Sequence, residues 1–223
     1  MLIGLCGQKE CGKSTVANIL VKALGYKEYA FATKLKKMCS TIFKVPIEDM
    51  HDKDRKELDF EKPIVLTQEH CNKIFDWVAY NDWKVSCADL DKMKKHIGAS
   101  YANPRKLMQG IGTEVCRDTF DPLIHAKLLF KQLEQENYQN YKIVISDARF
   151  VNERKMIRQK DGLNILIKCA EQIDNHSDHE SENQIGEITD YDYVLYNSKE
   201  QGLEILKEKT LALFEVITKD MGS

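Results

Sequence analysis

The sequence lacks any stretch that could cross a membrane or act as a secretion signal. The apolar run nearest its start, Leu2–Cys6, is far too short for either purpose. Low-complexity tracts and fixed-period repeats are absent as well. The chain has no large excess of positive or negative charge: 33 basic and 35 acidic residues give a net charge of −2. We therefore expect no membrane partner and no nucleic acid polymer bound through bulk charge.

The cysteine pattern argues against both a disulfide framework and a zinc site. The chain has seven cysteines, an odd number, and no C-x-x-C pair. Reduced thiols in a cytosol-like compartment fit this pattern best. We therefore expect a cytoplasmic protein, or one of the host cytoplasm if the source is viral.

Short apolar runs alternate with amphipathic segments along most of the chain, which predicts a parallel β-sheet covered by helices on both faces. Hydrophobic residues make up 43% of the sequence, enough for a sizeable core. The predicted strands are Leu2–Cys6, Tyr26–Phe31, Tyr141–Ser146, Leu163–Lys168 and Tyr193–Tyr196. The predicted helices are Lys13–Leu24, Lys34–Phe43, Arg105–Ile111, Leu123–Leu133, Asn152–Lys160 and Leu203–Ile217.

Two regions depart from this alternation. Residues 46–102 show no clear strand and read as a helical insertion on the substrate side, with Trp77 and Trp83 in its core. Residues 170–190 are polar and charged, typical of a mobile loop or lid. Between them, Asn103-Pro104 predicts a helix start, and Gly112-Thr113 predicts the break that ends that helix. For a chain of 223 residues we expect one domain overall.

The segment Gly7–Ser14 matches G-x-x-x-x-G-K-[ST], the pattern of a phosphate-binding loop. The glycines allow backbone torsions that other residues avoid, so successive N–H groups can point at phosphates at the start of a helix. Lys13 can reach the β- and γ-phosphates, and Ser14 offers a hydroxyl to Mg²⁺. We therefore predict a P-loop NTPase three-layer sandwich that uses ATP and Mg²⁺. The predicted ATP contacts are Gly7, Gln8, Lys9, Glu10, Cys11, Gly12, Lys13, Ser14 and Thr15.

Asp147 directly follows a predicted hydrophobic strand, where P-loop enzymes place the carboxylate that holds Mg²⁺ or its water ligands. The alternative is an ordinary strand-terminating or helix-capping aspartate. Arg149, two residues later, can reach the same crevice or lie on the surface.

A phosphate-binding loop alone does not separate kinases from GTPases and motors. Asn197-Ser198-Lys199-Glu200 does not match the N-K-x-D pattern of guanine recognition, and the chain is small and mildly acidic for a motor. A small-molecule kinase remains.

Several segments in order resemble the deoxynucleoside monophosphate kinases of bacteriophages and large DNA viruses. They are the loop in I-G-L-C-G-Q-K-E-C-G-K-S-T, Phe31-Ala32…Leu35-Lys36, Pro104-Arg105…Gln109…Gly112-Thr113-Glu114…Arg117, Ile145–Phe150 with Asn152-Glu153, His179–Glu182, and Asp192-Tyr193-Val194…Asn197. Dephospho-coenzyme A kinases begin similarly but normally carry an early D-x-D that is missing here. Animal phosphomevalonate kinases share more of the pattern and stay open as an alternative, as does a nucleotide-binding protein without turnover.

The resemblance implies the nucleoside monophosphate kinase version of the P-loop sheet and transfer of the ATP γ-phosphate to a deoxynucleoside monophosphate. The acceptor would lie between the Ala32–Lys36 and Arg105–Arg117 regions, and a homodimer stays open. Because the acceptor phosphate is already anionic, the chemical problem is repulsion between two polyanions rather than a missing base. Catalytic candidates are Lys13, Asp147, Arg149 and Arg117, with Ser14 and Asp147 at the metal. Substrate-binding candidates are Lys34, Arg105, Gln109, Thr113, Arg117, Arg149, His179 and Glu182.

Two further arginines, Arg154 and Arg158, follow Asn152-Glu153 on a predicted helix. We expect them to be surface residues. A metal site around His179 and Glu182 is disfavoured, because the ligand spacing is loose and no cysteine joins it.

Overall fold

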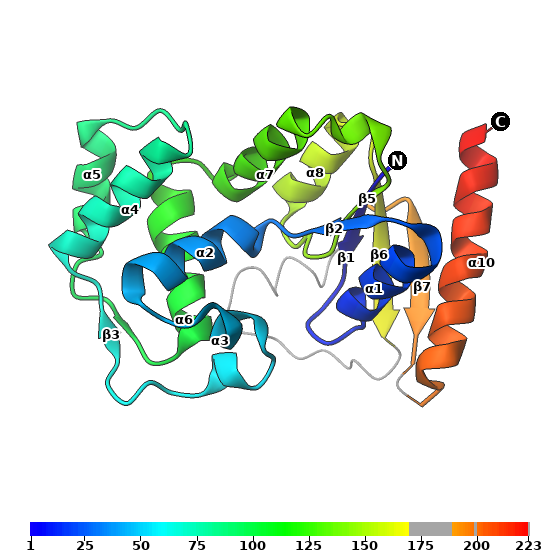
Figure 1. Ribbon diagram of the computed structural model, residues 1–223, viewed down its shortest axis with the longest axis horizontal. Coiled ribbons are helices and arrows are strands. Elements are labelled where there is room, and N and C mark those ends of the chain that lie inside the picture. Colours follow the sequence, from blue (N-terminus) through cyan, green and yellow to red (C-terminus); the bar gives the residue numbers. More distant parts are fainter. Residues whose placement is uncertain (170–188, 199, 223) are drawn as a thin grey trace. The chain divides into compact units, whose positions relative to one another are not determined.

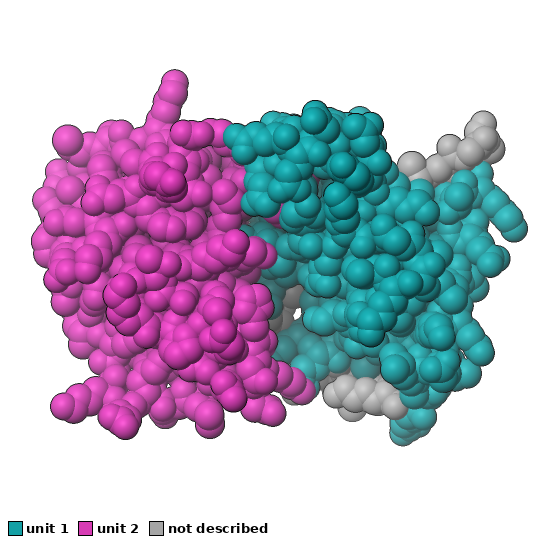
Figure 2. All heavy atoms as spheres, viewed as in Figure 1, with its two compact units in different colours: residues 1–31, 132–223 teal, residues 32–131 magenta. Residues whose placement is uncertain are grey.

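The computed structural model describes residues 1–169, 189–198 and 200–222 (Figure 1). The chain divides into two compact units, which Figure 2 colours separately. The first comprises Met1–Phe31 and Gln132–Ser223, and the second comprises Ala32–Lys131. Each unit is described by itself.

The first unit is built on a five-stranded sheet with the order β2-β5-β1-β6-β7. Each pair of neighbouring strands in it is parallel. The strands are β1 (Leu2–Cys6), β2 (Lys27–Tyr29), β5 (Ile143–Ile145), β6 (Leu163–Cys169) and β7 (Tyr193–Asn197). The predicted five-stranded parallel sheet is therefore confirmed, and β1 lies at its centre.

Helices cover both faces of this sheet, as the alternation along β1 shows. Ile3 and Leu5 pack in one core with Val16 of α1 (Lys13–Leu24) and Phe214 of α10 (Gly202–Gly222). Gly4, between them, faces α8 (Val151–Gln159), where an added Cβ would lie 2.4 Å from a methyl group of Ile157. Successive strand residues point to opposite faces, so the unit has the expected three layers.

The closing helix departs from the prediction at its start. The apolar spacing of this segment predicts an inward face of Leu203, Leu206, Leu213, Phe214 and Ile217, but Leu203 is 58% exposed, whereas Leu206, Phe214 and Ile217 are buried. Leu203 directly follows Gly202, the first residue of the helix. The first unit also contains a short 3₁₀ turn, η3 (Tyr138–Asn140).

The second unit is mainly helical. Its elements are α2 (Ala32–Phe43), α3 (Ile47–His51), η1 (Arg55–Glu57), α4 (Gln68–Tyr80), α5 (Cys87–Lys94), α6 (Pro104–Gln109), a π-helix η2 (Gly110–Arg117) and a two-stranded antiparallel ribbon of β3 (Ile64–Val65) and β4 (Ser100–Tyr101). Helix α7 (Ile124–Gln135) begins in this unit and ends in the first. The stretch 46–102 thus carries three α-helices, the 3₁₀ turn η1 and the ribbon.

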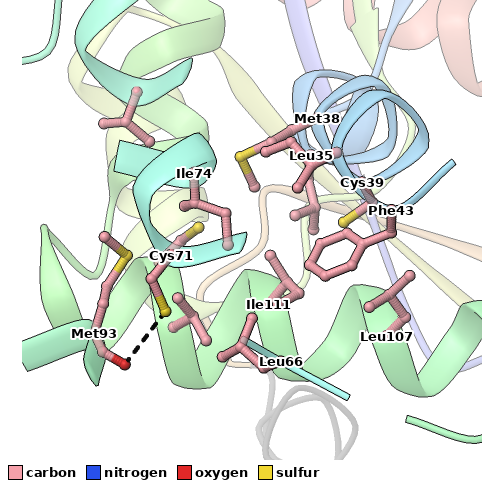
Figure 3. Close-up of a cluster of buried hydrophobic side chains, with 14 of the residues drawn as sticks. Leu35, Met38, Cys39, Phe43, Leu66, Cys71, Ile74, Met93, Leu107 and Ile111 are labelled. Carbon is pink, nitrogen blue, oxygen red and sulfur yellow. Dashed lines mark hydrogen bonds between the residues drawn. The ribbon is translucent and has the colours of Figure 1, made fainter. Parts of the chain in front are cut away.

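A separate hydrophobic core holds the second unit together (Figure 3). Side chains of α2, such as Leu35 and Met38, meet Ile74 of α4 and Ile111 of the π-helix in it. Trp77 and Trp83 pack against this core, as expected. All seven cysteines of the chain are free, and all but Cys87 are buried, so no disulfide contributes.

The helix that starts at Pro104 does not break where the sequence predicts. Its start is as expected, because the Asn103 side chain accepts a hydrogen bond from Lys106 N at 3.0 Å. The predicted break at Gly112-Thr113 is wrong: the chain continues as a π-helix to Arg117. Glycine there serves packing, since an added Cβ on Gly112 would lie 2.5 Å from a Leu35 methyl group. Gly110 is more constrained, at 2.2 Å from the Tyr101 ring.

Candidate active site

The phosphate-binding loop lies between β1 and α1 and depends on both of its glycines. Gly7 has φ 140°, and an added Cβ would lie 2.4 Å from the carbonyl oxygen of Ile167. Gly12, the N-cap of α1, has φ 103°. These are backbone conformations that residues with a Cβ rarely adopt. The predicted strand, loop and helix are all present, so the motif has the context that a phosphate cradle requires.

Lys13 closes this loop from the first turn of α1. Its Nζ donates hydrogen bonds to the carbonyl oxygens of Gly7 at 2.7 Å and Gln8 at 2.6 Å. It also lies 3.6 Å from Cys11 Sγ. The ammonium group is therefore held within the loop, while Ser14 is exposed on the same helical turn.

Asn197 supports the loop from the end of β7. Its Nδ2 donates to the carbonyl oxygen of Cys11 at 3.0 Å, and it would lie 2.7 Å from a Cβ added to Gly12. Asn197 belongs to the family pattern in the sequence, but that pattern assigns it no role. An asparagine at the end of a predicted strand was the available signal, and its contact with a loop 186 residues away was not readable from the sequence.

Asp147 lies beyond the end of β5, the strand that pairs with β1 through Gly4 and Ile145. Neighbouring parallel strands end at the same edge of a sheet, so Asp147 and the phosphate-binding loop belong to one edge. One carboxylate oxygen, Oδ1, accepts a hydrogen bond from Phe31 N at 2.7 Å. The aspartate thus also ties down the chain that follows β2.

The turn after Asp147 carries Arg149 and is held by α8. Glu153 Oε2 accepts hydrogen bonds from the backbone N–H groups of Arg149, at 2.9 Å, and Phe150, at 3.0 Å. Arg154 Nη1 donates to the Arg149 carbonyl oxygen at 2.7 Å. Both backbone groups of Arg149 are therefore fixed from one helix.

Arg154 corrects an expectation. It was predicted to be a surface residue, but its side chain is 1% exposed and pairs with Asp190 at 2.7 Å. The partner lies 36 residues further along the chain, outside the reach of any local sequence pattern. Arg158 is on the surface as expected, 42% exposed, and pairs with Asp192 at 2.8 Å.

The other described substrate candidates lie in the second unit. Lys34 Nζ, on α2, donates to Asn81 Oδ1 at 3.1 Å. Partial burial, together with Lys37 and Lys131, lowers the pKa of Lys34. Arg105, on α6, pairs with Glu57. Both cations are therefore already held by polar groups.

Gln109, Thr113 and Arg117 follow one another along α6 and the π-helix. Gln109 and Thr113 are half-buried, and Arg117 is 8% exposed. His125 Nε2 lies 3.1 Å from the Gly112 carbonyl oxygen, so that nitrogen carries the hydrogen. Burial, more than the nearby Arg117, lowers the pKa of His125 to about 4, so the ring is neutral near pH 7.

Some predicted features fall outside the described residues. His179, Glu182 and most of the 170–190 segment belong to this part of the chain. Among the described residues, no group of three or more His, Cys, Asp or Glu side chains could hold a metal ion. No described helix is long and apolar enough to cross a membrane.

Three comparisons place the chain among known proteins. Residues 1–210 match the family model of deoxynucleotide monophosphate kinase. A putative deoxynucleotide monophosphate kinase of Acanthamoeba polyphaga mimivirus is 30% identical over 209 residues, with 89% of each chain covered. The structure of a dephospho-CoA kinase from Campylobacter jejuni matches with a TM-score of 0.51 at 13% identity, over 98% of each chain, which supports the fold alone. The chain belongs to the deoxynucleotide monophosphate kinase family and is an ATP-dependent phosphotransferase.

Proposed function

We propose that this protein transfers the γ-phosphoryl group of ATP to a deoxynucleoside monophosphate, giving a deoxynucleoside diphosphate and ADP. The observation that carries the proposal is the glycine-dependent loop closed by Lys13, in a chain that matches the family over residues 1–210. The mimivirus relative carries the corresponding name.

The donor side of the reaction is assigned to the first unit. The loop residues from Gly7 to Thr15 would hold the ATP phosphates through backbone N–H groups at the start of α1. Glycine at position 7 makes this backbone path possible, since an added Cβ would lie 2.4 Å from the Ile167 carbonyl oxygen. Ser14 and Asp147 fit a Mg²⁺ ion, which takes a hydroxyl, a carboxylate and phosphate oxygens. The same Asp147 carboxylate accepts a hydrogen bond from Phe31 N, so it would serve both the ion and the chain that follows β2. When bound, the ion would neutralise developing charge on the phosphates.

The acceptor side is assigned to residues of the second unit. Arg105 and Arg117 would bind the monophosphate, with Lys34, Gln109 and Thr113 supplying further polar contacts. A phosphate acceptor needs no general base, because its oxygen is ionised near neutral pH with a second pKa of about 6. It needs cations that offset repulsion between donor and acceptor. Arg149, on the donor side, would contact the transferred group.

A substrate panel tests this proposal. ADP formation from ATP would be measured with each deoxynucleoside monophosphate, the matching ribonucleotide, the matching nucleoside and phosphomevalonate. We expect turnover with at least one deoxynucleoside monophosphate and none with its nucleoside, since the two differ only in the phosphate. A nucleoside rate comparable to that of its monophosphate would make the protein a nucleoside kinase. Activity on phosphomevalonate alone would support phosphoryl transfer to a phosphate group but would show that the acceptor is not a nucleotide.

A further inference from the structure

Arg154 is a buried arginine whose guanidinium group contacts two separate parts of the first unit. Its Nε and Nη2 donate to Asp190 Oδ1 at 2.9 and 2.7 Å. Its Nη1 donates to the carbonyl oxygen of Arg149 at 2.7 Å. The planar fork of arginine allows contacts in both directions at once, which a lysine cannot reproduce. One side chain thus links the Asp147–Phe150 turn to the chain that enters β7.

The geometry of the Arg154–Asp190 pair is poorly suited to a purely stabilising role. Both hydrogen bonds go to Oδ1, and among the described residues the buried Asp190 Oδ2 has no hydrogen-bond partner. Arg154 is 1% exposed and Asp190 is 23% exposed, so the charges lose much of their hydration, and an ion pair in such a place is weak evidence for stability. The contacts of Arg154 are better explained by the need to hold the Arg149 turn in position.

The chain that follows Asp190 forms β7, which ends at the phosphate-binding loop. Asp192 Oδ2 accepts from Asn164 N at 2.7 Å, which fixes the entry into β7. The same strand ends at Asn197, whose side chain holds the Cys11 carbonyl oxygen. Arg154 therefore connects the turn that carries Arg149 with the strand that supports the loop.

We propose that Arg154 and Asp190 form a positioning pair for phosphoryl transfer: they set the backbone of Arg149, and through it the guanidinium that contacts the transferred group. The role of Arg149 in this inference rests on the proposed function. Arg154 is 1% exposed, so it would act without touching a substrate, by fixing the Arg149 carbonyl while Glu153 fixes the Arg149 N–H. A catalytic group displaced by about 1 Å loses about 100-fold in rate, so such support has a kinetic effect.

The test compares Arg154→Lys with Arg158→Lys. The two arginines lie one helical turn apart on α8, and each pairs with an aspartate just before β7. Only Arg154 also contacts the turn. For Arg154→Lys we expect kcat to fall about 10- to 100-fold with KM for ATP within about twofold, and for Arg158→Lys we expect no change in kcat.

A double-mutant cycle separates positioning from general damage. In an Arg149→Ala background, Arg154→Lys should lower kcat no further, because the residue through which it acts is gone. Additive losses in kcat would overturn the proposal.

A second readout needs no turnover. Hydrogen exchange at the Arg149 and Phe150 amides should accelerate in Arg154→Lys and stay as in the parent for Arg158→Lys, with both variants folded by circular dichroism. Unchanged exchange at these amides in Arg154→Lys would overturn the pair as a positioning device. If no deoxynucleotide is phosphorylated, the proposed function fails, while the exchange measurement still decides whether the pair holds the turn.

Discussion

The side-chain amide of Asn197 donates to the carbonyl oxygen of Cys11 at 3.0 Å and thereby joins the end of β7 to the phosphate-binding loop. Lys13 Nζ donates to two further loop carbonyls, those of Gly7 and Gln8. The backbone shape of the loop is therefore set before any nucleotide arrives, and binding need not order it at that moment.

Lys13→Ala should lower kcat by at least about 100-fold, because one well-placed donor to developing phosphate charge is worth that much. The fold should persist, since the glycine torsions and Asn197 still shape the loop. Rates with ATP and the best monophosphate, beside a thermal melt, measure this. Lys22→Ala, an exposed lysine on the last turn of α1, is the control. Near-normal kcat in folded Lys13→Ala would contradict the loop assignment.

Asp147→Asn should raise the Mg²⁺ concentration needed for half-maximal rate. The amide oxygen of asparagine can still accept the Phe31 N–H bond, so the change removes charge and keeps the local structure. A Mg²⁺ titration of the rate is the measurement, with Asp91→Asn on the exposed face of α5 as control. If the metal dependence is unaltered, Asp147 is a structural residue only.

Arg117→Lys should raise KM for the monophosphate about tenfold or more and change KM for ATP little. A charge-assisted arginine–phosphate contact is worth about 1.5–3 kcal/mol, and lysine cannot bind the phosphate in a bidentate manner. Lysine also retains a charge at a position where Arg117 is 8% exposed. Lys106→Ala, exposed on α6, serves as control. Equal effects on both substrates would indicate misfolding or a donor-side role.

The stability of the second unit should fall in mild acid because of His125. Burial lowers its pKa to about 4, against 6.5 for an ordinary histidine. Between these values the unfolded chain binds a proton that the folded chain excludes, so stability is lost as pH falls from about 6.5 to 4. The pKa shift sets an upper limit of about 3 kcal/mol, less where water reaches the ring.

Denaturant unfolding from pH 7 to 4.5 measures this loss. His125→Gln keeps an N–H donor for the Gly112 carbonyl and has no titrating group, so its stability should depend less on pH across this window. Identical pH dependence in both proteins would refute the contribution of His125.

The features that the sequence predicts well are those set by short-range patterns. The apolar run Leu2–Cys6, the glycines at 7 and 12, and the periodicity of α2 each specify local structure, and each appears in place. The features that it misses depend on partners far along the chain. Arg154 can be buried because its charge pairs with that of Asp190. The helix continues through Gly112 because glycine has no Cβ, which leaves room for the Leu35 side chain. Neither partner is visible in a local window of sequence.

The central place of β1 in the sheet has a consequence for how the protein is made. Both neighbours of β1, the strands β5 and β6, lie more than 130 residues later in the sequence. A ribosome adds about 5–20 residues per second, so β1 waits roughly 10–30 s for its second neighbour to be synthesised. The second unit, by contrast, is one continuous segment with its own core. During synthesis, β1 therefore has neither neighbour in the sheet until the whole second unit has been made, and an unpaired apolar strand is open to chaperones for that time.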